Sequence, residues 1–205
     1  TANVVALVGA TPRLVDVDPS TMNVDPERVA EAVGPRTRAV LGVHLFGAPL
    51  DWDELRRAVP DSVALIEDAA GALGASYHGR PCGSLGVMGC LSFHPRKIVT
   101  TGEGGAVTTN DGALADTIRR LRHHGIEPSG AFEIRTPAPN YRLADILCAV
   151  GIPQLRRLRA LHDARARIAR GYGQRLAELV EIPAAAEDDV HGWQAYVVQL
   201  DRRDE

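Results

Sequence analysis

The residues best suited to chemistry lie in one stretch near the middle of the chain. Lys97 comes five positions after Ser92 and is followed by a glycine-dense turn, Gly102–Gly105. A lysine is normally a surface charge, but glycines let the backbone approach a ligand closely and offer amide donors to an anion. The Ser92 hydroxyl could donate to the same anion. For the glycines alone, a tight turn that needs positive φ is the simpler interpretation.

A second candidate group is the carboxylate of Asp68, which comes just after the apolar run Val63–Ile66. Open α/β sheets bind ligands outside the carboxyl ends of their strands, and His44 and Ser92 also fall at such ends. A carboxylate that follows a buried strand needs a partner. Asp68 is therefore either a ligand-binding group or a structural one, such as a helix cap or half of a salt bridge.

Motifs of several other chemistries are absent from the sequence. The glycines of Gly83–Gly89 do not match the dinucleotide-binding pattern GxGxxG, and the chain has no GxxxxGK[ST] phosphate loop and no GxSxG nucleophile elbow. His123 and His124 are adjacent, so they cannot share one helix face as metal ligands. We therefore expect no metal site and no serine-hydrolase site.

The elements that would position these residues alternate between short strands and helices. The expected strands are Arg13–Val17, Ala39–His44, Val63–Ile66, Cys90–Phe93 and Ala106–Thr108, and the expected helices are Pro26–Val33, Trp52–Val59 and Ala113–His123. Asp51 is well placed to cap the second of these helices, with Glu54 at its third position. This rhythm predicts an α/β fold with a mostly parallel wound sheet and helices on both faces.

The pattern changes near Leu143 to a long helical stretch, which we expect Pro153 to interrupt and Pro183 to end. Trp193–Leu200 alternates like a strand. We predict a large domain over residues 1–150, a long connecting helix over 151–180 and the start of a small α/β domain over 181–205. Because the chain starts without Met and in mid-pattern, we expect an internal fragment that lacks both ends.

Composition narrows the classes of partner. The 205 residues carry a net charge of −3, which leaves no basic footprint for nucleic acid or an anionic membrane. No apolar run approaches the ~18 residues of a membrane span. The three cysteines, Cys82, Cys90 and Cys148, form no CxxC pair, which favours a reducing compartment and a cytoplasmic protein.

Taken in order, six short motifs along the chain resemble the DegT/DnrJ/EryC1/StrS family of sugar aminotransferases. That family depends on pyridoxal 5'-phosphate (PLP) and has the aspartate-aminotransferase (type I) fold, so the resemblance implies the large domain of that fold. The matching segments are Thr1–Ala10, Val15–Pro19 (VDVDP), Val43–Gly47 (VHLFG), Glu67–Ala70 (EDAA), Ser92–Gly105 (SF, K and GEGG) and Asn140–Arg142 (NYR).

The resemblance assigns roles to five positions. Lys97 matches the lysine that carries PLP covalently, and Asp68 matches the carboxylate that pairs with the pyridine nitrogen. Ser92 matches a serine that contacts the phosphate, and Asn140 matches an asparagine that reaches the phosphate from the partner subunit of a homodimer. Gly71, at the edge of the implied cofactor site, stands where the family commonly has Gln, His or Glu.

These roles are chemically coherent. A carboxylate against the pyridine nitrogen keeps it protonated, so that the ring works as an electron sink. The amine of Lys97, once free, can move a proton between the amino-acid carbon and the cofactor. Lys97 and Asp68 are thus the predicted catalytic residues.

The resemblance implies an enzyme that transfers an amino group from an amino acid, with glutamate as the expected donor, to a keto group of a nucleotide-linked sugar. Such reactions serve the biosynthesis of polysaccharide or antibiotic sugars. Two alternatives remain open. One is a PLP-dependent sugar dehydratase, although those relatives usually replace the lysine with His. The other is a non-catalytic regulatory member of the fold, although it would not need Lys97, Asp68 and Ser92 together.

Overall fold

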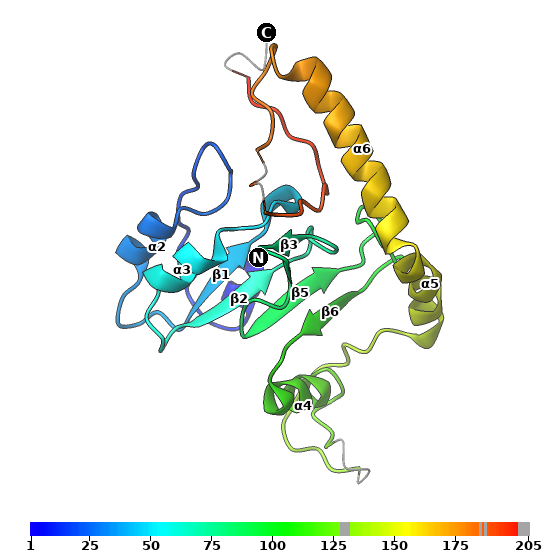
Figure 1. Ribbon diagram of the computed structural model, residues 1–205. Coiled ribbons are helices and arrows are strands. Elements are labelled where there is room, and N and C mark those ends of the chain that lie inside the picture. Colours follow the sequence, from blue (N-terminus) through cyan, green and yellow to red (C-terminus); the bar gives the residue numbers. More distant parts are fainter. Residues whose placement is uncertain (128–131, 185, 187, 201–205) are drawn as a thin grey trace.

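The centre of the computed structural model is a four-stranded sheet with the order β1-β2-β5-β6 (Figure 1). The structure describes residues 1–127, 132–184, 186 and 188–200. Strands β1, β2 and β5 are parallel, and β6 is antiparallel to β5, so the sheet is mostly parallel as predicted. The strands are β1 (Ala39–Val43), β2 (Ala64–Asp68), β5 (Met88–Ser92) and β6 (Gly105–Thr108), beside a separate hairpin of β3 (Ser76–Tyr77) and β4 (Arg80–Pro81).

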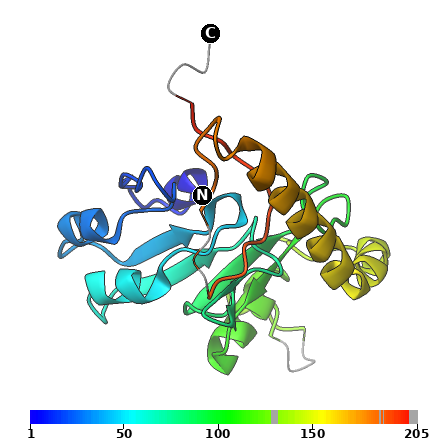
Figure 2. The ribbon, with the colours of Figure 1, turned by 45° about the horizontal axis from the view of Figure 1, so that its top comes forward.

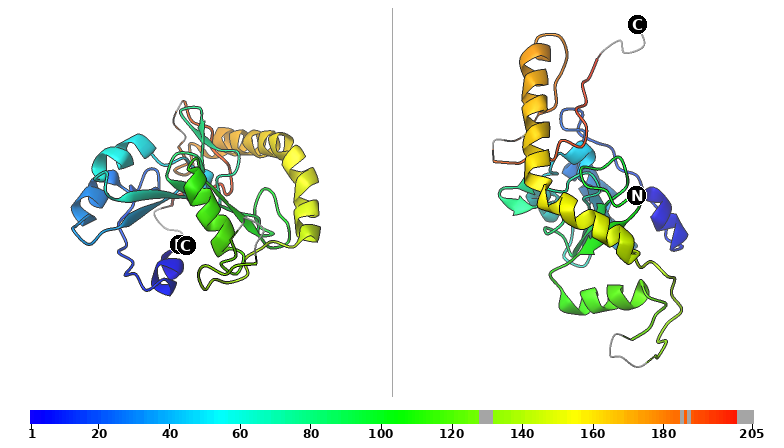
Figure 3. Two further views of the ribbon diagram at one scale, coloured as in Figure 1. Left: turned by 90° about the horizontal axis from the view of Figure 1, so that it is seen from below. Right: turned by 90° about the vertical axis from the view of Figure 1, so that its right-hand side faces the viewer.

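Three of the helices begin at an aspartate whose side chain accepts hydrogen bonds from the first turn, as strong N-caps do. They are α2 (Pro26–Ala32) after Asp25, α3 (Trp52–Ala58) after Asp51 and α4 (Gly112–Leu121) after Asp111. The Asp51 cap is confirmed, because its Oδ1 accepts from Glu54 N at 2.9 Å. Helices α2 and α3 lie on one side of the sheet, and the short helix α1 (Ala2–Leu7) lies on the other (Figure 3).

The main core lies between the sheet and helices α2 and α3. Gly42 of β1 allows this close packing, since an added Cβ would lie 2.8 Å from the side chain of Leu50. The core residues come from both helices and from the strands and turns around them: Val29, Leu50, Trp52, Leu55, Val59, Val63, Leu65 and Tyr77. Strand β1 is only partly buried.

The long helical stretch is divided differently from the prediction. Helix α5 (Asp145–Arg156) runs through Pro153, and α6 (Leu158–Leu176) begins after a break at Arg157. Proline has a helical φ and removes only one backbone hydrogen bond, so it need not end a helix. Figure 1 shows α6 as a long rod along one side of the sheet. It ends well before Pro183. No helix in the described part of the chain is long and apolar enough to cross a membrane.

Two predicted strands are wrong. Residues 13–17 and 193–200 have extended stretches but form only the isolated bridges Val17↔Val24 and Glu181↔Gln199. In the first segment Leu14 is 84% exposed, and Val15 packs against the main core. An apolar run becomes a strand only where another strand can pair with it.

The predicted division into a large domain, a connecting helix and a small domain stays a prediction. Residues 201–205 lie outside the described part.

Candidate functional site

Asp68 is the last residue of β2, at the carboxyl edge of the sheet. Its Oδ1 accepts a hydrogen bond from Ala70 N at 3.1 Å, which is an Asx turn, and its Oδ2 accepts one from the hydroxyl of Thr1. No helix begins at this turn, so Asp68 does not cap one. Thr1 was missed as a candidate from the sequence, because nothing local connects it to a residue 67 positions away.

Ser92 lies on the neighbouring strand at the same edge. Asp68 of β2 pairs with Cys90 of β5, which places Ser92 two residues further along a parallel strand. Ser92 Oγ accepts from His94 N at 3.4 Å. The sheet therefore brings Asp68 and Ser92 to one edge, as the sequence predicted for residues at strand ends.

Lys97 lies in a closed loop, residues 93–104, that follows β5. The base of the loop is joined by Phe93 N donating to Gly104 O at 2.9 Å. Lys97 N donates to His94 O at 2.9 Å and forms a turn inside the loop. Gly102 (φ 85°) and Gly104 (φ 151°) have positive φ, which confirms the tight-turn interpretation of these glycines.

The loop of residues 93–104, called the lysine loop below, is anchored through the residues that follow Lys97. Ile98 and Val99 are buried, and Gln154 of α5 makes two hydrogen bonds to the backbone of Thr100, with Oε1 accepting from N at 3.1 Å and Nε2 donating to O at 2.6 Å. Helix α5 comes this close because Gly151 has no Cβ, which would lie 2.9 Å from Thr101 Cγ2. The loop that carries Lys97 is thus held on both the sheet and α5.

Gly71 lies in the turn after β2, and the side chain of Gln194 packs over it. An added Cβ at Gly71 would lie 3.4 Å from Cγ of Gln194. The Nε2 of Gln194 donates to Arg96 O at 2.7 Å, next to Lys97. The structure thereby connects the turn after Asp68 with the lysine loop, through a residue that sequence reasoning missed.

A buried polar pair lies beneath this edge. Glu67 and His44 are 0% and 1% exposed, and His44 Nε2 lies 3.0 Å from Glu67 Oε2. The Nδ1 of His44 accepts from Leu50 N at 3.0 Å, so the proton is on Nε2 and the imidazole is neutral. Burial alone would raise the pKa of Glu67, but hydrogen bonds from His44, Gly86 and Gly83 outweigh it and hold the pKa below its ordinary value.

Asn140 lies apart from these strand ends. It forms a bridge with His123, just after α4, and Tyr141 N donates to Arg122 O at 2.8 Å. Its Oδ1 accepts from Arg142 Nε at 3.1 Å, and the side chain is exposed. Its contact with a cofactor of the partner subunit stays a prediction.

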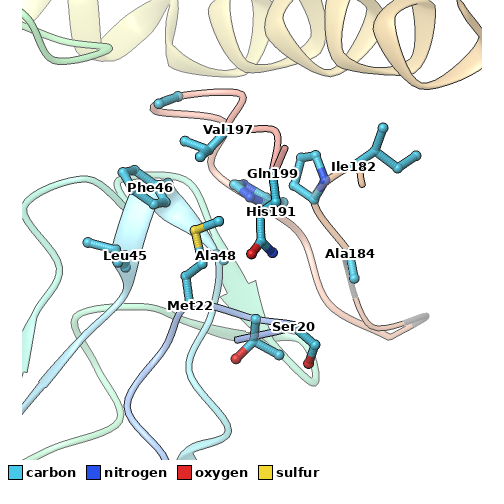
Figure 4. Close-up of a pocket in the computed structure, with 13 residues that line it drawn as sticks. Ser20, Met22, Leu45, Phe46, Ala48, Ile182, Ala184, His191, Val197 and Gln199 are labelled. Carbon is cyan, nitrogen blue, oxygen red and sulfur yellow. The ribbon is translucent and has the colours of Figure 1, made fainter. Parts of the chain in front are cut away.

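A small pocket with a volume of about 20 Å³ lies next to the turn after β1 (Figure 4). It lies between the turn Ser20–Met22, the segment Leu45–Ala48 and the chain from Ile182 to Gln199. Its lining does not include Asp68, Ser92 or Lys97. His191 lines the pocket, and burial lowers the pKa of this imidazole to about 4, so the group is neutral.

In the described residues no cluster of His, Cys, Asp or Glu could hold a metal ion.

Comparison with known proteins identifies the class of fold. The structure is similar to DesV from S. venezuelae, with a TM-score of 0.93 and 36% identity over 99% of this chain and 55% of that chain. It is also similar to Spr1654 from Streptococcus pneumoniae, described as a sugar aminotransferase and solved in a PLP form, with a TM-score of 0.91 and 28% identity over 97% of this chain and 57% of that chain. The fold is therefore the α/β fold of PLP-dependent aminotransferases, as predicted.

Residues 1–205 match the model of the DegT/DnrJ/EryC1/StrS aminotransferase family, and the chain belongs to that family. A curated relative is GDP-perosamine synthase from Caulobacter vibrioides, which is 42% identical over 203 residues, 97% of this chain and 55% of the relative. The chain thus spans about half the length of the relatives it matches. The resemblance of the motifs to this family is confirmed.

Proposed function

We propose that the whole protein is a PLP-dependent sugar aminotransferase that moves an amino group from an amino acid, glutamate, to a keto group of a nucleotide-linked sugar. The observation that carries this proposal is the placement of Lys97. It is the only lysine among the 205 residues, and it lies in an anchored loop that follows the strand beside Asp68. The printed name of the curated relative, GDP-perosamine synthase, supports a nucleotide-linked sugar as the acceptor.

The groups present at the strand ends fit PLP. Asp68 is a half-buried carboxylate that accepts one neutral donor at each oxygen, so it retains acceptor capacity for a pyridine N–H. Ser92, at the end of the neighbouring strand β5, offers a hydroxyl donor for the phosphate. Lys97 would hold the cofactor, which when bound supplies an electron sink for the carbon that loses a proton.

The chain's own residues have separable tasks in this reaction. The Asp68 carboxylate, fixed by Ala70 and Thr1, would keep a pyridine nitrogen protonated. The free Nζ of Lys97 would take a proton from one carbon and deliver it to another, which is general acid–base catalysis by one group. Ser92 would orient the phosphate end.

The test uses the whole protein with PLP and records its visible absorption before and after glutamate is added. We expect a band of lysine-bound PLP in the wild type and conversion to the aminated cofactor by glutamate. Lys97→Ala and Lys97→Arg should both lack the covalent band. The arginine variant is the matched control, because it keeps the positive charge and loses only the reactive amine.

Each alternative predicts a different result. A band that no amino-acid donor converts would favour a PLP enzyme of another class, such as the sugar dehydratases. Absence of any PLP binding would favour a non-catalytic member of the fold and would refute the role of Lys97. Borohydride reduction followed by peptide mass mapping locates the bound cofactor, since within this chain only one lysine can carry it.

The proposal includes a homodimer with shared active sites. Large apolar side chains are exposed on different sides of α5 and just before it: Tyr141, Ile146, Val150, Ile152 and Leu155. A second copy packed against this helix would also bring Asn140 close to a neighbour. If the site is shared, Lys97→Ala and Asn140→Ala should each abolish activity. Mixing the two proteins should restore it, because a mixed dimer has one intact site. A monomer in light scattering would refute the shared site.

A cytoplasmic location of the protein stays a prediction.

A further inference from the structure

Three segments that are distant in the sequence meet at the carboxyl edge of the sheet. Gly192 N donates to Gly47 O at 2.7 Å, and an added Cβ at Gly47 would lie 2.9 Å from the carbonyl oxygen of Gly71. An added Cβ at Gly192 would lie 3.3 Å from the carbonyl oxygens of the other two glycines. The backbones touch here without side chains between them. Figure 2 shows the C-terminal segment, in red, crossing this edge.

Two non-glycine residues beside this contact have strained backbones. Phe46 has a φ of 56° and Trp193 a φ of 47°, both in the left-handed region that side chains disfavour. Gln194 N donates to Phe46 O at 2.9 Å across the junction. Strain of this kind persists only where the surroundings fix it, and it is concentrated at functional sites. The junction therefore holds Gln194 in a defined place.

The side chain of Gln194 extends from the junction to the lysine loop. Its Cγ and Cβ lie 3.4 and 3.5 Å from where a Cβ of Gly71 would be, so it packs over that glycine. Its Nε2 donates to Arg96 O at 2.7 Å. The Arg96 carbonyl belongs to the same planar peptide unit as the N–H of Lys97, and that N–H donates to His94 O at 2.9 Å.

We propose that Gln194 is a positioning residue for Lys97, acting through the peptide bond between Arg96 and Lys97. This peptide is hydrogen-bonded at both polar atoms, and its plane sets the direction of the Lys97 side chain. Gly71 is part of the arrangement, because a larger side chain there would displace Gln194. The consequence for PLP rests on the proposed function, whereas the effect on the lysine itself does not.

The primary experiment measures the apo-protein. The whole protein, without PLP, is treated with trinitrobenzenesulfonate, and the labelling rate of Lys97 is followed by peptide mass mapping. Loss of one hydrogen bond allows the loop to open more often, so labelling should accelerate roughly 2- to 10-fold in Gln194→Ala. Gln194→Glu keeps the size but puts an acceptor against Arg96 O, and it should show at least the same acceleration.

Gln199→Ala is the matched control. Gln199 lies on the same segment, and its Nε2 donates to a backbone carbonyl, Pro19 O, at 2.8 Å, away from the lysine loop. This variant should label at the wild-type rate. Gly71→Ala should also behave as wild type, because its Cβ makes ordinary contacts, whereas Gly71→Leu should reproduce Gln194→Ala. The double variant should then add little, since both substitutions remove the same interaction.

A second readout uses the PLP-loaded protein. The pH midpoint of the visible band should differ between wild type and Gln194→Glu but not between wild type and Gln199→Ala, which a general loss of stability would not produce. Unchanged labelling and an unchanged midpoint in both Gln194 variants would overturn the inference while leaving the proposed function intact. Changed labelling in a protein that binds no PLP would support the positioning role and refute the proposed function.

Discussion

Replacing Glu67 with Gln should destabilise the fold far more than the similar size of the two side chains suggests. The fully buried carboxylate accepts four hydrogen bonds. Its Oε2 accepts from Gly83 N at 2.5 Å and from His44 Nε2 at 3.0 Å. Its Oε1 accepts from Leu85 N at 2.6 Å and Gly86 N at 2.9 Å. Glu67 therefore ties strand β2 to the turn that precedes β5 and to the residue that follows β1.

The cost follows from the donor count. A glutamine amide has one acceptor and one donor group, so in either orientation its NH₂ faces two N–H donors that the carboxylate had satisfied. Each buried donor left without an acceptor costs about 1–3 kcal/mol. We expect a loss of about 3 kcal/mol or more, which for a protein about twice the length of this chain lowers the melting temperature by roughly 3–6 °C.

The assay is thermal unfolding of the whole protein, with Glu54→Gln as the control. Glu54 pairs with Arg57 at 2.7 Å, but both side chains are exposed, and such a pair contributes less than ~1 kcal/mol. Because the folded pKa of Glu67 lies below 4.5, its contribution is present above that pH and is lost as the pH falls through the lower value. A Glu67→Gln melting temperature equal to that of the control at neutral pH would refute the reasoning.

Two further predictions concern other buried groups. Burial lowers the pKa of His191 from 6.5 to about 4, so the folded state binds fewer protons than the unfolded state between these values. Stability should therefore fall by about 3 kcal/mol as the pH drops from 6.5 to 4, and His191→Phe should remove that slope in urea unfolding. Asp51→Ala removes a helix cap and also the acceptor of the buried Tyr77 hydroxyl, 2.8 Å away. It should cost about 2 kcal/mol, against about 1 kcal/mol for Asp111→Ala, which removes a cap alone; equal losses would contradict this.

Local signals in the sequence were enough to locate the strand ends. The apolar run before Asp68 marked a buried strand and Cys90–Phe93 a short one, and parallel strands place their last residues at one edge. The glycines after Lys97 marked a turn with positive φ. These features depend on neighbours in the chain, so a reading of residue types and spacing could find them.

The contacts that complete the site depend on distant residues and gave no such signal. The hydrogen bond from Gln194 to Arg96 joins positions 98 apart, and that from Thr1 to Asp68 joins positions 67 apart. The predicted strand at residues 193–200 is wrong because the N–H groups of Gln194 and Ala195 donate to Phe46 O in the turn after β1, and Gln199 forms only an isolated bridge with Glu181. Alternating side chains indicate two faces, but they do not indicate what covers them.

The adjacent acids of β2 illustrate how the sheet separates stability from chemistry. Successive side chains of a strand point to opposite faces, so Glu67 and Asp68 cannot share a site. Glu67 accepts hydrogen bonds from four donors on the buried face and fixes the position of β2 relative to the turn at residues 83–86. Asp68, on the other face, has only two donors and keeps acceptor capacity. The hydrogen bonds of the first carboxylate hold β2 in place, so that the second stays at the strand end with acceptor capacity left over.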